Sequence, residues 1–189
     1  MLRDLVKTCR SYRRFYQDVP IPLEDLRDMA DTARLTASAA NAQALRFRIV
    51  TDETEKDSVF AAINWAAALK DWDGPEEGER PSAYIVIACD LSVGKNKQWD
   101  DGIAAQTIML SAVEKGFGGC MIGSCRREDI ARALGIDTDA YSIDLVLALG
   151  KPKEKVVLVP VGGDGSTTYY RDEEGTHYVP KRSLEDVLL

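Results

Sequence analysis

Two arginines and two hydroxyl-bearing residues are adjacent near the start of the sequence, in the segment Arg10-Ser11-Tyr12-Arg13. A guanidinium group binds phosphate through two parallel hydrogen bonds, and a second positive charge a few ångströms away strengthens that binding. The segment therefore predicts a site for a phosphorylated ligand, held by these four residues. A solvated basic turn is the other interpretation, because such clusters are common on protein surfaces.

A glycine-rich segment, residues 118–124, has the sequence Gly-Gly-Cys-Met-Ile-Gly-Ser. Glycine allows a flat ligand to approach the main chain closely, where exposed N–H groups can meet its heteroatoms. The segment matches neither the GxGxxG dinucleotide motif nor a P-loop. The alternative is a helix end followed by a tight turn.

Three polar side chains, Ser38, Asn41 and Gln43, lie in an unperiodic stretch of small residues, 36–43, which we interpret as a loop. Small neighbours would leave these side chains accessible to a ligand. A turn stabilised by Ser or Asn side chains is the alternative.

Residues for acid–base or metal chemistry are scarce. The single histidine, His177, lies in an irregular stretch where a surface position is the simpler expectation, and no catalytic triad fits. The four cysteines form no CxxC pair, so we expect no metal site and interpret them as free thiols. The sequence thus offers residues that bind phosphate and loops of small residues, but no set of side chains for acid–base catalysis. This combination is typical of a protein in which a bound cofactor carries out the chemistry.

The elements that would position these residues follow from hydrophobic patterning. Residues 83–89 are continuously apolar, which predicts a central strand covered on both faces. Residues 102–115 are apolar nearly all round and predict a buried helix. Further helices are expected at 23–33, 53–72 and 127–134, and Gly135 should end the last of them. Further strands are expected at 46–49, 120–122 and 145–149, and a loop is expected at 72–81.

These elements predict one α+β domain spanning residues 1–189, with 156–189 as a C-terminal extension. The periodicity fades in the extension, which has too little apolar surface to fold alone. We therefore expect it to pack as an arm on the body or on a second subunit.

The composition and charge of the chain argue against nucleic-acid-binding and membrane-spanning proteins. The chain is 45% hydrophobic and 29% charged, with a net charge of −7, which argues against a broad nucleic-acid surface. The first residues lack an apolar signal region, and no stretch approaches the roughly 20 apolar residues of a membrane span. We expect a cytoplasmic protein that binds neither nucleic acid nor membranes.

The motifs, taken in order, resemble those of the nitroreductase family. Residues 10–15 followed by Val19-Pro20 look like its opening motif, and residues 37–47 are similar to its second motif, PSxxNxQPWRF. Residues 100–106 together with 116–123 resemble the third motif of the family, and residues 147–152 resemble the fourth. The stretches 65–87 and 177–188 also resemble a subgroup of short family members, so the likeness covers nearly the whole chain.

This resemblance implies a central, mainly antiparallel sheet in an α/β/α sandwich, and a homodimer with FMN at its interface. Arg10 and Ser11 would hold the phosphate and ribityl chain, and Arg13 would stabilise the reduced flavin near its N1–C2=O edge. Further contacts would come from Ser38, Asn41 and Gln43 of the other subunit, from the main chain of Ile122 and Gly123, and from Lys181 and Arg182 at the phosphate.

The implied activity is an FMN-dependent oxidoreductase. Hydride from NADH or NADPH would pass to flavin N5 and then, by a ping-pong route, to an electron-poor nitroaromatic or quinone-like acceptor. Two alternatives keep the flavin: a non-catalytic sensor or FMN carrier, and a relative that dehalogenates its substrate or fragments flavin. The sequence departs from the family pattern at Ala37, Ala44 and Leu45, where proline, proline and tryptophan are usual, and at Asp101, where close relatives often carry cysteine.

Overall fold

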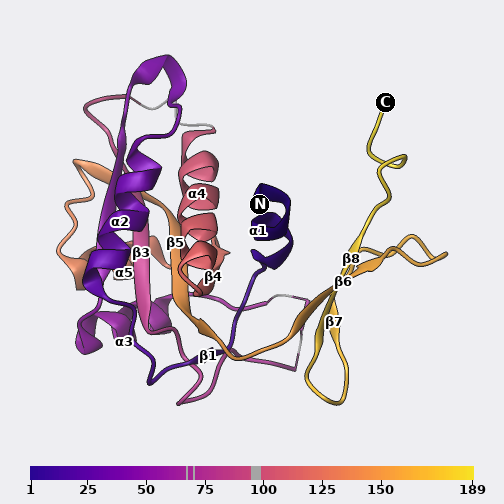
Figure 1. The fold of residues 1–189 in the computed structure, drawn as a ribbon. Helices are drawn as coiled ribbons and strands as arrows, with labels where there is room; N and C mark the ends of the chain where they lie inside the picture. Colours follow the sequence, from indigo (N-terminus) through magenta and orange to yellow (C-terminus); the bar gives the residue numbers. More distant parts are fainter. Residues whose placement is uncertain (67, 70, 95–98) are drawn as a thin grey trace.

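A five-stranded antiparallel sheet forms the centre of the computed structural model, which describes residues 1–66, 68–69, 71–94 and 99–189 (Figure 1). The sheet runs β2–β3–β5, and the far side of β5 pairs with both β4 and β1. Its strands are β1 (Phe15–Tyr16), β2 (Leu45–Val50), β3 (Ala83–Asp90), β4 (Gly118–Ile122) and β5 (Tyr141–Pro152).

The two central strands are the apolar runs expected from the sequence. The first seven residues of β3 are buried, and β3 pairs with β5 in a register that sets Ile85 opposite Leu147 and Val86 opposite Val146. Because successive side chains on a strand point to opposite faces, Ile85 and Val86 enter two different cores. The expectation of a strand covered on both faces is confirmed.

Helices cover both faces of the sheet, as Figure 1 shows. Leu26 of α2 and Ile108 of α4 pack on one face, while Val59 of α3 and Ile130 of α5 pack on the other. The architecture is the expected α+β sandwich with an antiparallel sheet flanked by helices. The helices are α1 (Leu2–Thr8), α2 (Leu23–Arg34), α3 (Glu53–Ala62), α4 (Asp100–Glu114) and α5 (Arg127–Leu134). Helix α1 contacts α4. Helix α5 ends at Gly135, which has a φ of 64°, as expected.

The helix expected over residues 53–72 is shorter in the structure. It ends at Ala62, because Ile63 turns extended and bridges Cys125, and the N–H of Asn64 donates to the Ser124 oxygen at 2.9 Å. The predicted helix is therefore wrong beyond Ala62, because this long-range pairing outweighs the helical pattern. Residues 67 and 70 of the predicted range lie outside the described part of the chain.

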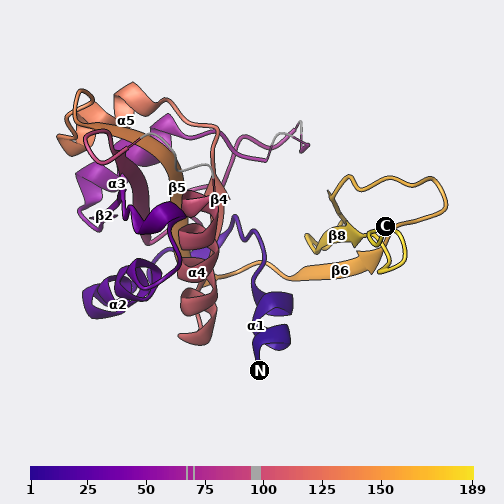
Figure 2. The same ribbon diagram turned by 90° about the horizontal axis from the view of Figure 1, so that it is seen from above.

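The C-terminal extension forms a second, small sheet. Strands β6 (Val156–Pro160) and β8 (His177–Lys181) pair in parallel, and β7 (Tyr170–Arg171) pairs antiparallel with β8. This arm projects from the body in both Figure 1 and Figure 2. Among the described residues no helix is long and apolar enough to cross a membrane.

Candidate functional site

The basic segment at residues 10–13 extends the sheet beyond β4. Ser11 forms a parallel bridge with Gly119, and the N–H of Tyr12 donates to the Gly119 oxygen at 2.8 Å. This pairing sets the segment against the body, where Arg10, Ser11 and Arg13 line a pocket of about 300 Å³. The arm closes the pocket with Tyr169, His177, Val179 and Lys181, and the remaining wall is Cys9, Gln106, Met109 and Met121.

A second hollow of about 170 Å³ adjoins the first. Arg13, Met121 and Tyr169 line both, and Ile122 and Gly123 line only the second. The two hollows therefore form one candidate site that runs from the cationic residues at Arg10 to the main chain at Gly123. The structure brings together six of the residues proposed for the cofactor: Arg10, Ser11, Arg13, Ile122, Gly123 and Lys181.

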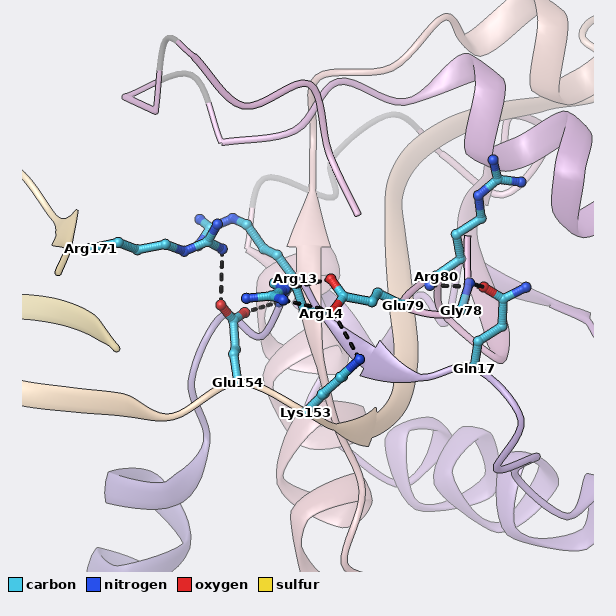
Figure 3. A network of polar contacts seen from close by, with 9 residues as sticks. All are labelled: Arg13, Arg14, Gln17, Gly78, Glu79, Arg80, Lys153, Glu154 and Arg171. Carbon is cyan, nitrogen blue, oxygen red and sulfur yellow. Dashed lines mark hydrogen bonds and ion pairs between the residues drawn. The ribbon is translucent and has the colours of Figure 1, made fainter. Parts of the chain in front are cut away.

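Arg13 is held at the junction of the two hollows by the arm and by a buried carboxylate. Its guanidinium carbon lies 5.0 Å from the centre of the Tyr169 ring, and its Nη1 donates to the Ser11 oxygen at 3.2 Å. Its main-chain N–H donates to Glu154 Oε1, while Glu154 Oε2 accepts from Arg171 Nη2 at 2.9 Å (Figure 3). The Glu154 side chain is only 1% exposed, so this carboxylate fixes the main chain of Arg13 in a water-poor environment.

Beside this contact lies a second ionic cluster, built around Glu79 (Figure 3). Arg14 Nη2 donates to Glu79 Oε1 at 2.6 Å, and Lys153 Nζ lies 2.9 Å from the same oxygen. The hydrogen bonds from Arg14 and then Lys153 lower the pKa of Glu79 to about 2. The cluster ties the loop at 72–81 to Arg14, directly after the basic segment, and to Lys153, directly after β5.

His177 is buried rather than on the surface, so the surface interpretation was wrong. It is 2% exposed, its ring lies 5.1 Å from the ring of Tyr169, and among the described residues nothing hydrogen-bonds to its Nδ1. Burial lowers the pKa of His177, and the charges of Arg13 and Arg171 lower it further. The site thus contains a neutral imidazole with an unsatisfied nitrogen, a feature that suits a polar ligand.

The other proposed residues lie outside this site. Ser38 and Gln43 line a separate groove beside α2, where Ser38 Oγ donates to Asp100 Oδ2 at 2.6 Å. Asn41 and Arg182 are exposed and line neither hollow. Tyr12 turns away, because its hydroxyl donates to the Thr8 oxygen at 2.8 Å. Within one chain, the proposed cofactor residues therefore divide into two separate groups.

The glycines of residues 118–124 serve mainly the protein's own packing. A Cβ on Gly118 would lie 2.7 Å from the Tyr12 ring, and one on Gly119 would lie 2.3 Å from the Ala148 oxygen. Gly123 alone of the three lines the candidate site. The close approach that the pattern predicts is thus made at Gly118 and Gly119 by neighbouring protein atoms.

Two site residues, Tyr169 and Glu154, were not expected from the sequence. Tyr169 lies where periodicity fades, and Glu154 stands among lysines, a pattern typical of an exposed turn. A single glutamate in such a setting carries no signal of burial. Their roles depend on contacts with residues more than a hundred positions away.

Comparison with known proteins identifies the family to which the chain belongs. The chain is 26% identical to MhqN of Bacillus subtilis, a candidate NAD(P)H nitroreductase, with 79% of this chain and 87% of that protein covered. It is 24% identical to an iodotyrosine deiodinase of Thermotoga neapolitana, over 82% and 90% of the two chains. A nitroreductase-like structure from Desulfovibrio desulfuricans in complex with FMN superposes with a TM-score of 0.70 at 20% identity, covering 100% of this chain and 95% of that one. The family model described as Nitroreductase family matches residues 6–151, and the chain belongs to that family.

Proposed function

We propose that the protein is an FMN-dependent oxidoreductase that takes hydride from NADH or NADPH and passes it to a nitroaromatic or quinone-like acceptor by a ping-pong route. The observation that carries this proposal is the convergence of Arg10, Arg13 and Lys181 on one site whose far end is the main chain of Ile122 and Gly123. Relatives described as candidate NAD(P)H nitroreductases and the FMN complex of a similar fold support it.

The residues present fit FMN. Three cations suit a phosphate dianion, and two buried nitrogens, Arg10 Nε and His177 Nδ1, lack partners among the described residues. FMN would supply hydride transfer at N5, while the protein supplies binding, orientation and electrostatics. Arg10, Ser11 and Lys181 would hold the phosphate, and Arg13 would place its charge where negative charge develops on reduction.

We further propose a homodimer in which Ser38, Asn41 and Gln43 of the second subunit complete each site. Support comes from the division of the proposed cofactor residues into two separate groups. The neighbouring helices α1 and α4, together with Trp99 directly before α4, also expose apolar side chains that would suit an interface: Leu2, Val6, Trp99 and Ile103.

Anaerobic reduction tests the proposed activity. The purified protein loaded with FMN should be yellow, and NADH or NADPH should bleach it in a stopped-flow instrument before a nitroaromatic or quinone restores the colour. Protein that fails to bind added FMN would refute the cofactor. Protein that binds FMN but reduces only slowly with either nicotinamide would favour the alternative of a non-catalytic sensor or carrier. Including a halogenated tyrosine among the acceptors tests dehalogenation, the chemistry named for the relative from Thermotoga neapolitana.

A further inference from the structure

The single histidine of the chain is fixed in the wall of the candidate cofactor site. His177 begins strand β8, its main-chain N–H donates to the Lys155 oxygen at 2.8 Å, and its ring packs against the ring of Tyr169. Alternate residues of a strand share one face, and His177, Val179 and Lys181 accordingly all line the pocket of about 300 Å³. A cofactor bound in this pocket would therefore meet the imidazole.

One nitrogen of the His177 ring, Nδ1, is buried and has no hydrogen-bond partner among the described residues. His177 is 2% exposed, so its burial also keeps bulk water away from the ring. A buried polar atom without a partner is uncommon in folded proteins, and an ordered water or a ligand usually satisfies it. A ligand oxygen in the pocket that His177 lines can be this partner.

The charges around the imidazole are mainly positive. The titratable groups that line the pocket or act on the ring are the cations Arg10, Arg13, Arg171 and Lys181, the carboxylate Glu154, the phenol Tyr169 and the thiol Cys9. Burial lowers the pKa of His177; Glu154 opposes this shift, while Arg13 and Arg171 add to it. The part of α4 that lines the pocket carries no charge. Without an anionic ligand the imidazole is therefore neutral at pH 7.

A phosphate group would reverse this balance. It carries a charge of roughly −1.5 to −2 near pH 7. Negative charge nearby favours the imidazolium, which offers an N–H donor at both ring nitrogens. We propose that His177 is a proton-binding residue of the cofactor site, which becomes positively charged when FMN binds and thereby favours phosphorylated flavin over riboflavin. This inference rests on the proposed FMN site.

Binding of FMN and binding of the proton then strengthen each other, because the coupling between two sites is reciprocal. Since the ring is neutral before FMN binds and charged afterwards, a fall in pH favours the complex. Riboflavin lacks the phosphate group and gains nothing from the proton. The phosphate of FMN itself takes up a proton near about pH 6, so the informative range is about pH 6.5 to 8.

Proton NMR of the unchanged full-length protein tests the proposal without any substitution. The single imidazole signal should titrate at a higher pH with saturating FMN than in the protein without ligand. Riboflavin at saturation should leave the titration where it is without ligand. A titration with FMN at the same pH as without ligand, or an equal shift with riboflavin, overturns the proposal.

A substitution that cannot bind the proton tests the effect on affinity. His177→Asn keeps a polar side-chain atom near the position of Nδ1 but does not titrate. Calorimetric titration with FMN should show that, from about pH 8 to pH 6.5, the affinity of the unchanged protein rises at least about threefold relative to that of the variant. Tyr170→Phe, on the same small sheet but outside the pocket, is the control and should keep the pH dependence of the unchanged protein. The same pH dependence in His177→Asn as in the unchanged protein overturns the proposal.

The outcomes separate this inference from the proposed function. FMN that binds without moving the titration of His177 refutes the role of His177 and leaves the proposed function intact. If FMN does not bind, but inorganic phosphate raises the pH at which His177 titrates, the proposed function is refuted and the phosphate-linked proton remains. If neither FMN nor inorganic phosphate has an effect, both proposals are overturned.

Discussion

The main-chain N–H of Arg13 donates a hydrogen bond to the buried carboxylate of Glu154, 141 positions later in the sequence (Figure 3). The same carboxylate pairs with Arg171 of the arm, so one side chain joins the basic segment, the exit of β5 and the arm. A buried charge is tolerated only when it is paired and hydrogen-bonded, and Glu154 meets both conditions. The position of Arg13 in the candidate site thus depends on how the arm is seated.

Substitutions of Glu154 should separate its two contacts. Glu154→Gln keeps an oxygen for the Arg13 N–H, whereas Glu154→Ala removes both the acceptor of this N–H and the carboxylate partner of Arg171. We expect the alanine variant to lose about 3 kcal/mol of unfolding free energy in urea, and to bind FMN more weakly than the glutamine variant does. Equal FMN dissociation constants for the two variants would contradict a role in positioning Arg13.

Replacing Arg13 by methionine should make the flavin harder to reduce. Its positive charge favours the anionic reduced flavin, so its loss should lower the midpoint potential by roughly 20–60 mV, equivalent to about 1–3 kcal/mol for a two-electron couple. Spectroscopic redox titration measures this shift. Arg132→Met, at an exposed site on α5, is the control. An unchanged potential would remove Arg13 from the mechanism.

The Glu79 cluster predicts a loss of stability in acid. Hydrogen bonds from Arg14 and Lys153 hold the pKa of Glu79 at about 2 in the folded chain, compared with 4.5 for the free side chain. A depressed folded pKa stabilises the protein fully above pH 4.5, and the contribution, worth roughly 3 kcal/mol, disappears as the pH falls towards 2. Urea unfolding at a series of pH values should show this slope, and Glu79→Gln should reduce it. If the unfolding free energy of Glu79→Gln fell with pH as steeply as that of the unchanged protein, the acid sensitivity would belong to other groups.

His177 should titrate below 6.5, its usual pKa, because burial and the neighbouring arginines disfavour the imidazolium. It is the sole histidine of the chain, so a single imidazole signal in proton NMR reports the value directly. A depressed folded pKa means that stability is complete above pH 6.5 and declines as the pH falls through the folded value. A measured pKa at or above 6.5 in the protein without FMN would contradict the prediction and would show that the negative charge of Glu154 outweighs burial and the two arginines.

Gly119 should tolerate no side chain, since a Cβ there would lie 2.3 Å from the Ala148 oxygen on the paired strand. We expect Gly119→Ala to cost roughly 3 kcal/mol in unfolding free energy, because the β4–β5 pair must separate. Gly163→Ala, at an exposed position with nothing within 4 Å of the new methyl group, is the matched control and should be nearly neutral. Similar denaturation midpoints for both variants would show that β4 shifts freely.

Patterns within one element were predictable, whereas contacts between distant elements were not. The apolar run of β3 and the ending of α5 at Gly135 follow from local rules of burial and backbone conformation. The end of α3 does not, because the pairing of Ile63 with Cys125 lies outside any local window. The positions of Glu154 and His177 have the same origin, since Glu154 accepts a hydrogen bond from the Arg13 N–H, 141 positions earlier, and His177 lines a pocket with Arg10 and Met109.

The twelve residues of β5 pair with β1, β3 and β4, and all three pairings join segments far apart in the sequence. During synthesis from the N-terminus, β3 therefore has no partner on one side until β5 has left the ribosome. In the meantime that edge presents unpaired main-chain N–H and C=O groups on a strand of apolar side chains, which is a hazard for aggregation. Sheet assembly should accordingly occur late and cooperatively, and chaperone dependence should concentrate in the interval between the synthesis of β3 and that of β5.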